Sequence, residues 1–434
     1  MKKGILWGII GVMSLLVLGA FSEKAEAIPA FARKYKTACI TCHATFPRLT
    51  ALGEAFRLNG YKLPGQDELY VKDPPVILGA AAYKQVFPNA VWPSDLPGMP
   101  PLSIRFKTDY DYDVGGTRAS RTNFGIDEAA LLGAGSLGEN MAFFAEIAHH
   151  EPSLSSTLNP DNTISNNFDS GTEFVGWLMW KDLFKKVLGE HLLNLRLGTT
   201  GKQDLALPNT RGEGRITVEH YLYEDELEIE SSVGVELNGF GRQWRYNAGV
   251  LNGDGASSKK NYFAAASFKI GGLGYDGSGG TTVEGGLNTT PSGYWRDDSI
   301  RIGALYYKTY SGPEGFGFDR VGADVRANYM DLSVAGGFIT GKNDETNERK
   351  DIWFAEAEYF VFPWMQPYVR YEALKSDVAN GDKSRFIVGV ALLARANVKF
   401  NLEGRFYTKN EPIEVTTGGK NNEDRVVVRL DYAF

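Results

Sequence analysis

The two cysteines of the chain lie in one short motif, Cys39-Ile40-Thr41-Cys42-His43. C-x-x-C-H is the attachment signature of a c-type haem, in which each thiol bonds to a vinyl group and the histidine binds the iron. A thioredoxin-like dithiol would require alternating strands and helices, which the sequence does not indicate. A zinc site would require a second pair of ligands, but the 434 residues hold no other cysteine. The motif therefore predicts one covalent haem c, bound by Cys39, Cys42 and His43.

The second axial position of the iron has several candidates. Met99 lies in Leu96-Pro97-Gly98-Met99-Pro100-Pro101, where prolines would stiffen a loop that holds the thioether toward iron. We predict Met99 as the sixth ligand, although it could equally occupy an apolar linker. The alternatives are an open site or one of four histidines: His149, His150, His191 and His220. Because His149 and His150 are adjacent, only one of them can face a given side of an extended strand.

The residues after the motif predict a short helix that packs on the haem. Four apolar residues recur at steps of three and four, which places them on one helical face: Phe46, Leu49, Leu52 and Phe56. Pro47 lies near the expected start and Gly60 just past the expected end, the usual placement of these residues at helix termini. Residues 28–101 are therefore predicted to form a small α-helical cytochrome c domain with its linker.

Residues 1–27 have the three parts of a secretory signal peptide. Two lysines precede an apolar run over residues 4–21, and Ala25-Glu26-Ala27 supplies an A-x-A cleavage site. The run is long enough to be retained as an anchor helix, but the cleavage site favours its removal. No later apolar stretch reaches about 18 residues, so a helical membrane protein is excluded.

From residue 102 onward, apolar and polar residues alternate with a period of two. In residues 102–113 one face is apolar or aromatic, while the other carries Ser103, Arg105, Lys107 and three aspartates. The same alternation recurs in residues 398–407 and, less cleanly, between these segments. Such alternation over about 10 residues is the signature of an outer-membrane barrel strand. A soluble sandwich alternates too, but charged side chains in strand after strand favour a water-filled lumen.

Aromatic residues and chain length support the same fold. Aromatic side chains gather near predicted strand ends, as in the girdles of membrane barrels: Tyr110, Tyr112, Tyr306, Tyr307, Tyr432 and Phe434. At about 20 residues per strand and connection, residues 102–434 give about 16 strands. The predicted fold is mainly β, with a C-terminal antiparallel outer-membrane barrel of about 16 strands after the small helical domain.

The charge is divided unevenly between the two predicted parts. Residues 28–101 carry eight Lys/Arg and five Asp/Glu, net +3, whereas residues 102–434 carry 35 and 46, net −11. Opposite net charges are consistent with docking of one part on the other. The acidic body excludes nucleic acid as a partner, because nucleic-acid binding requires a concentrated basic face. The acidic run from Glu224 to Glu230 is interpreted as a solvated loop or lumen face.

Further residues around the motif form a recognisable pattern: Ile28 to Arg33, Phe46-Pro47, Gly53 to Phe56 and Asn59 to Tyr61. Over about residues 28–64 the chain resembles the cytochrome domain of the fused monohaem cytochrome–porins of outer membranes, whose members include iron-oxidising cytochromes. The barrel is similar to that family in architecture and length. The resemblance implies that the haem domain plugs or lines the barrel mouth, and that electrons cross the outer membrane through a single haem.

These features predict outer-membrane electron transfer through one haem held in or at a porin barrel. Electrons would pass between an extracellular donor or acceptor, such as Fe(II), and periplasmic cytochromes, with outer-membrane lipid around the barrel. The alternative is a diffusion porin with a structural or regulatory haem domain. No triad, paired-carboxylate or second metal motif supports a haem enzyme acting on a small molecule. The direction of electron flow depends on the haem potential and on the partners.

Overall fold

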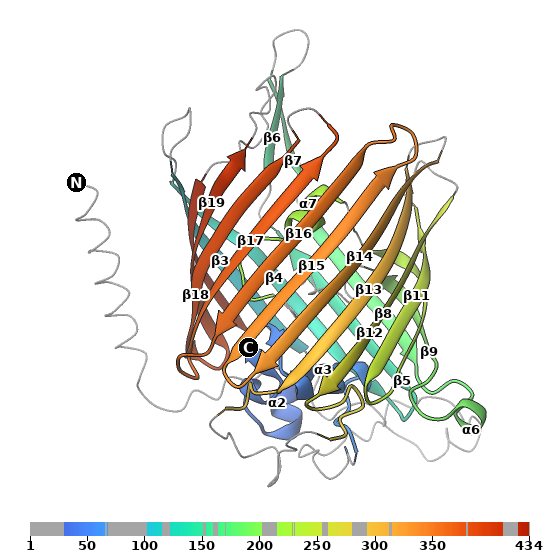
Figure 1. Cartoon of the computed structure of the whole chain (residues 1–434). Helices are drawn as coiled ribbons and strands as arrows, with labels where there is room; N and C mark the ends of the chain where they lie inside the picture. Colours follow the sequence, from blue (N-terminus) through green and yellow to red (C-terminus); the bar gives the residue numbers. More distant parts are fainter. Residues whose placement is uncertain are drawn as a thin grey trace.

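A closed β-barrel dominates the computed structural model (Figure 1). The structure describes residues 30–65, 67, 102–114, 122–150, 153–158, 164–169, 171–201, 215–227, 229, 231–253, 259–279, 293–311, 315–378, 381–410 and 424–433. The predicted signal peptide over residues 1–27 and the predicted ligand Met99 lie outside these residues. Within the described ranges, no α-helix combines the length and the apolar content needed to cross a bilayer.

Sixteen antiparallel strands form the barrel, which confirms the mainly β fold and the strand number expected from chain length. The ring closes where β20 pairs with β3 and where β9 pairs with β10. Its strands are β3 (Leu102–Val114), β4 (Thr122–Leu137), β5 (Met141–His149), β8 (Thr172–Trp180), β9 (Asn194–Thr200), β10 (Ser232–Phe240), β11 (Trp244–Asn252), β12 (Lys260–Gly271), β13 (Ser299–Ser311), β14 (Phe316–Tyr329), β15 (Leu332–Asn343), β16 (Arg349–Tyr359), β17 (Met365–Ser376), β18 (Lys383–Arg395), β19 (Val398–Asn410) and β20 (Asp424–Ala433). A separate hairpin, β6 (Ser153–Leu158) with β7 (Ile164–Asp169), projects from one end, and the short helix α6 (Lys185–Leu188) lies at the other (Figure 1).

The two faces of the wall have opposite chemistry, as strand β12 illustrates. Tyr262, Phe268 and Ile270 are 44–53% exposed, whereas the alternating residues Ser267 and Lys269 are buried. Similar exposed apolar side chains recur on the other strands. An apolar exterior around a charged interior is the pattern of a barrel that spans a lipid bilayer.

The predicted aromatic girdle needs one correction. Tyr306 is 40% exposed, but its neighbour Tyr307 is 1% exposed and packs inside the barrel. Adjacent residues of a strand point to opposite faces, so the two tyrosines cannot both face outward. Phe434 lies outside the described residues.

Residues 30–65, which we call the plug, lie within the end of the barrel that also holds the C-terminus (Figure 1). The plug consists of α2 (Ala30–Tyr35), the 3-10 turn η1 (Cys39–Thr41), the hairpin β1 (His43–Thr45) with β2 (Arg48–Leu49), and α3 (Ala51–Leu58). Aromatic rings gather at its centre, where Phe31 and Phe56 meet edge to face with centroids 4.9 Å apart. Phe31 also stacks on Tyr61 at 5.2 Å.

The helix of the plug begins later than the sequence predicted. Pairing of β1 with β2 holds the residues after the motif as a hairpin, so Phe46 and Leu49 do not belong to the helical face. The helix starts at Ala51, because the Thr50 side chain accepts a hydrogen bond from the Gly53 backbone and caps it. The predicted end is confirmed, because Gly60 follows the helix with a φ of +68°.

A second segment, residues 215–227 and 229, follows β9 and precedes β10 in the chain and lies inside the barrel; we call it the inner loop. Its short helix α7 (Leu222–Glu226) is visible within the ring in Figure 1. The loop side chains pack on inward apolar residues of six strands in one cluster: Tyr221, Leu222, Tyr223, Leu227 and Ile229 with Leu251, Phe263, Ala265, Leu305, Tyr307, Ala335, Ile339, Ile352, Phe354 and Leu374. The interior is therefore partly apolar, and the predicted solvation of the acidic run is wrong at Glu224, whose side chain is 1% exposed.

Candidate functional site

The Cys39–His43 motif occupies a tight turn that leads into the plug hairpin. The Cys42 N–H donates to the Cys39 carbonyl at 3.1 Å, and His43 opens strand β1. Helix α3 packs directly behind this turn, because a Cβ atom on Gly53 would overlap the carbonyl oxygen of Cys42. Only a residue without a side chain allows this close approach, so Gly53 fixes the helix against the motif.

The His43 ring is held in one orientation. Its Nδ1 lies 2.9 Å from the carbonyl oxygen of Pro47, and since a carbonyl only accepts, Nδ1 carries the proton and donates it. Burial lowers the pKa of His43 to about 4, against the opposing effect of backbone hydrogen bonds. The ring is therefore neutral near pH 7, and Nε2 keeps the lone pair with which histidine binds a metal.

The two cysteines are free thiols inside the barrel. Burial raises the pKa of Cys39 to about 11, and burial together with the neighbouring Cys39 raises that of Cys42 to about 12. Cysteines of redox dithiols have lowered pKa values in electropositive surroundings. Cys39 and Cys42 instead have raised pKa values and are protonated near pH 7, which disfavours a thioredoxin-like role. Both sulfur atoms are free to form a covalent bond to a cofactor.

Cys39, Cys42 and His43 line one cavity of about 620 Å³ between the plug and the barrel wall. The plug side is largely apolar and includes Phe31, Phe46, Leu49 and Phe56. The wall side is charged: Arg105, Lys107, Glu128, Glu146, Lys399, Arg429 and Asp431. The volume is in the range of cofactor sites. Two thiols, a neutral imidazole and an apolar floor fit a haem, whose ring is flat and apolar; the cations of the wall are paired with wall carboxylates.

The structure separates the four candidate histidines. His150 and His220 line the cavity, whereas His149 and His191 do not. His149 is exposed at the end of β5, as expected for adjacent residues of an extended strand that face opposite ways. His191 stacks on Phe240, with centroids 4.8 Å apart. Met99 lies outside the described residues, so its role as a ligand stays a prediction.

One side of the plug docks on strands β5 and β8 through aromatic and polar contacts. Tyr61 stacks on Trp177, with centroids 5.9 Å apart and planes inclined by 13°. The Lys181 ammonium donates to the backbone and side-chain oxygens of Asn59 at 2.7 and 2.8 Å. A Cβ on Gly60 would clash with the Lys181 side chain, so the plug is tightly apposed to this wall.

The other side of the plug is held by ion pairs to distant strands. Arg48 pairs with Glu358 of β16 and donates to the Ser333 hydroxyl of β15 at 3.2 Å. Glu54 pairs with Arg245 of β11 at 3.0 Å. Contacts to strands across the ring place the plug within the lumen rather than beside it.

Two sets of residues at this site were not identified from the sequence. Arg105 and Lys107 were assigned to a polar strand face, but nothing in the sequence shows that this face opposes the cysteines. His220 was one of four candidate ligands, but the inner loop that carries it has no motif, and its position in the lumen was signalled only by the unusual length of the connection between β9 and β10.

Comparison with known proteins finds porin folds. No family model matches the chain, and no curated protein matches it. The chain is similar in structure to a Salmonella typhi OmpF in complex with daunomycin, with a TM-score of 0.50 and 10% identity over 77% of this chain and 97% of that chain. An anion-selective porin from Comamonas acidovorans has a TM-score of 0.49 and 12% identity over 77% and 98%. At 10% identity, the likeness to OmpF establishes a porin-type barrel fold.

Proposed function

We propose that this protein transfers electrons across the outer membrane through one covalent haem c. The haem would be bound by Cys39 and Cys42 and ligated by His43, with residues 28–101 as the cytochrome domain, residues 102–434 as the barrel and residues 1–27 as a cleaved signal peptide. Electrons would pass between an extracellular donor or acceptor, such as Fe(II), and periplasmic cytochromes. The observation that carries this proposal is that both thiols and the His43 ring line one cavity inside a closed barrel.

The chain's own residues prepare the site for this role. Pro47 orients the His43 ring, and burial keeps it neutral, so that its Nε2 faces a ligand without first losing a proton. Haem, when bound, supplies a one-electron centre. The plug and the inner loop fill much of the lumen with packed side chains.

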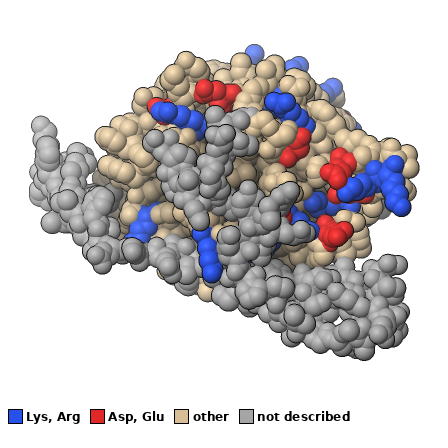
Figure 2. All heavy atoms as spheres, turned by 90° about the horizontal axis from the view of Figure 1, so that it is seen from below, with Lys and Arg blue, Asp and Glu red and all other residues tan. Residues whose placement is uncertain are grey.

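Among the described residues, the end of the barrel that holds the plug shows no single charged patch. In Figure 2 basic and acidic side chains are interspersed on the described surface of this end. A periplasmic cytochrome would meet a mixed surface here, so salt should weaken its association only moderately.

A diffusion porin is the second candidate, and the structural comparison favours it. The fold is that of a porin. In this alternative small solutes would pass through the barrel, and the plug would be structural or regulatory. Against it stand the plug and the inner loop, which both lie within the lumen.

Denaturing gels of the purified full chain, stained for haem, test the proposal. We expect stain that survives denaturation in the wild type and in the control Thr41→Ser, and none in the double variant Cys39→Ala/Cys42→Ala. Heat-modifiable gel mobility reports whether the barrel of each variant has folded. Absence of covalent haem from the wild type would refute electron transfer through this site.

Redox titration and liposome swelling then separate the two functions. The haem-loaded protein should accept an electron from Fe(II) and pass it to an oxidised periplasmic cytochrome, or accept one from a reduced periplasmic cytochrome and pass it to an extracellular acceptor. Proteoliposomes should swell slowly in sugar solutions compared with those containing an open porin. Rapid swelling together with a redox-inert haem would establish the diffusion porin instead.

A further inference from the structure

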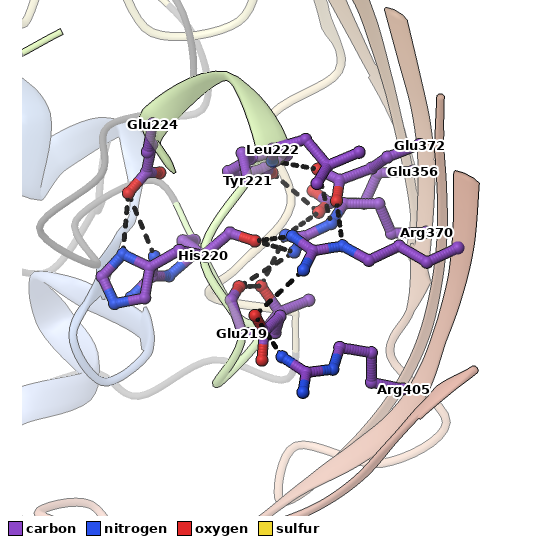
Figure 3. Close-up of polar contacts among 12 residues, drawn as sticks. Glu219, His220, Tyr221, Leu222, Glu224, Glu356, Arg370, Glu372 and Arg405 are labelled. Atoms are coloured by element: carbon purple, nitrogen blue, oxygen red, sulfur yellow. Dashed lines mark hydrogen bonds and ion pairs between the residues drawn. The ribbon is translucent and has the colours of Figure 1, made fainter. Parts of the chain in front are cut away.

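The inner loop is held rigidly against the wall where it passes the cavity. Buried Arg370 donates to the carbonyl oxygens of Glu219 and His220 at 2.9 Å each (Figure 3). Buried Arg385 donates to the His220 carbonyl at 2.5 Å. Glu403 accepts the Glu219 N–H at 2.7 Å. Charge-assisted hydrogen bonds in a buried setting are strong and directional, so the backbone of residue 220 has a fixed position.

The His220 side chain points away from this wall. Figure 3 shows its ring turned from the barrel strands toward the ribbon of the plug. Its Nδ1 lies 2.8 Å from Glu224 Oε2, and the Glu224 side chain is 1% exposed. The ring itself is 55% exposed, because it projects into the cavity that Cys39 and Cys42 also line. A carboxylate on Nδ1 fixes the ring and leaves Nε2 as the free edge, which is the usual second partner of a metal-binding histidine.

The other described candidates are less suited to bind the same group. His150 lines the cavity, but its Nδ1 faces the Asp127 carbonyl at 3.0 Å and its Nε2 lies 3.8 Å from a Glu173 oxygen. Both of its ring nitrogens therefore face protein oxygens. No described methionine lines the cavity. Beside His43, His220 is therefore the remaining described histidine that lines the cavity, and Glu224 anchors its Nδ1.

We propose that His220 is the second axial ligand of the haem, with Glu224 as its positioning residue. This inference rests on the proposed function, because it requires a haem on Cys39 and Cys42. The plug would supply one axial ligand and the barrel the other, so the iron would join the two parts of the chain. Two histidines also set a lower reduction potential than histidine with methionine.

Spectra of the full haem-loaded protein test the ligand. We expect a low-spin, six-coordinate wild type that binds carbon monoxide slowly, and a high-spin His220→Ala that binds it at least tenfold faster. Added imidazole should restore the low-spin spectrum of His220→Ala. His220→Met should stay low-spin with a raised midpoint potential, and Glu224→Gln should shift the potential while the spin state is kept.

Three control variants make the test specific. His149→Ala, His150→Ala and Met99→Ala should all keep the wild-type spectrum. A low-spin His220→Ala, or a high-spin Met99→Ala or His150→Ala, would overturn the proposal. Haem-stained gels are run on every variant: wild-type protein without covalent haem would end the proposed function itself, whereas stained protein with an unchanged His220→Ala spectrum would end only this inference.

Discussion

The plug and the inner loop both fill the lumen, but they are held there by different means. The inner loop is anchored by fully buried arginines and glutamates and by an apolar cluster shared with many strands. The plug touches the wall by an aromatic stack on one side and by a few ion pairs on the other, and beside it lies the cavity. The difference between the two segments indicates that the barrel wall and the inner loop form a fixed frame. The plug is held to this frame by fewer contacts, and it carries Cys39, Cys42 and His43.

Removal of Arg370 should have the largest effect on this frame. Its guanidinium lies 3.7 Å from Glu356 and 3.3 Å from Glu372, and the side chain is fully buried. Arg370→Met would leave buried carboxylates without a partner, so we expect a loss of about 3–5 kcal/mol in the free energy of unfolding. Urea unfolding followed by gel mobility measures it. Arg349→Met breaks an exposed pair with Asp351 and should cost under about 1 kcal/mol. Equal losses of unfolding free energy in the two variants would show that the buried ion pairs do not stabilise the barrel more than the exposed one.

The thiols should be unreactive in protein made without haem attachment. With pKa values of about 11 and 12, the thiolate fraction of each at pH 7.5 is about 100-fold or more below that of an ordinary cysteine. Alkylation by iodoacetamide should therefore be slow and should accelerate about tenfold per pH unit up to about pH 11. Mass spectrometry of the native protein reports the rate, and urea-unfolded protein is the control. Equal rates in the native and unfolded protein would show that the plug does not enclose its motif.

Gly53→Ala should loosen the plug without disturbing the frame. The added methyl group would meet the Cys42 carbonyl, and overpacking of this kind costs about 1–3 kcal/mol. Hydrogen exchange in residues 51–58 should accelerate, and the yield of covalent haem should fall. Ala51→Ser, at the partly exposed start of the same helix, is the matched control. Faster exchange in the inner loop of Gly53→Ala would show instead that the two segments are coupled.

Loss of the Glu54 charge should have the smallest effect on the stability of the plug, and this effect should depend on pH. Burial alone would raise the pKa of Glu54, but Arg245 and other cations lower it below its ordinary value. The stabilisation is therefore present above about pH 4.3, the unfolded value, and is lost as pH falls through the lower folded value. Glu54→Gln should cost about 1 kcal/mol at pH 7, with the difference vanishing in acid. Hydrogen exchange of the plug measures this, and Glu190→Gln, in an exposed pair, should change nothing.

The barrel could be predicted from sequence because its signal is local. Alternation along a strand such as β12 reports which side chains face lipid, and chain length limits the number of strands. Tyr307 was misplaced, because adjacent aromatic residues do not reveal which of them faces inward. The apolar inner cluster was missed for a related reason: it exists only because the inner loop covers those strands, and loop placement is a long-range property.

The candidate site was predictable only in part. The motif residues Cys39, Cys42 and His43 are close in sequence, so their chemistry follows from spacing alone. The opposite side of the cavity comes from strands and a loop more than sixty residues away, and no pattern in the sequence links His220 to the motif. The start of the helix was also misplaced, because residues 43–49 pair as a hairpin and Thr50 caps a helix that begins at Ala51.

Closure of the ring has a consequence for a group bound to the plug. The plug precedes every barrel strand in the chain. The barrel around it closes when the last strand, β20, pairs with the first, β3, and we call this pairing the seam. Ion pairs of Arg425 with Asp111 and of Arg429 with Asp109 fasten that seam. If the haem proposed above is joined to Cys42, it would be enclosed by the strands of the barrel once this seam has formed.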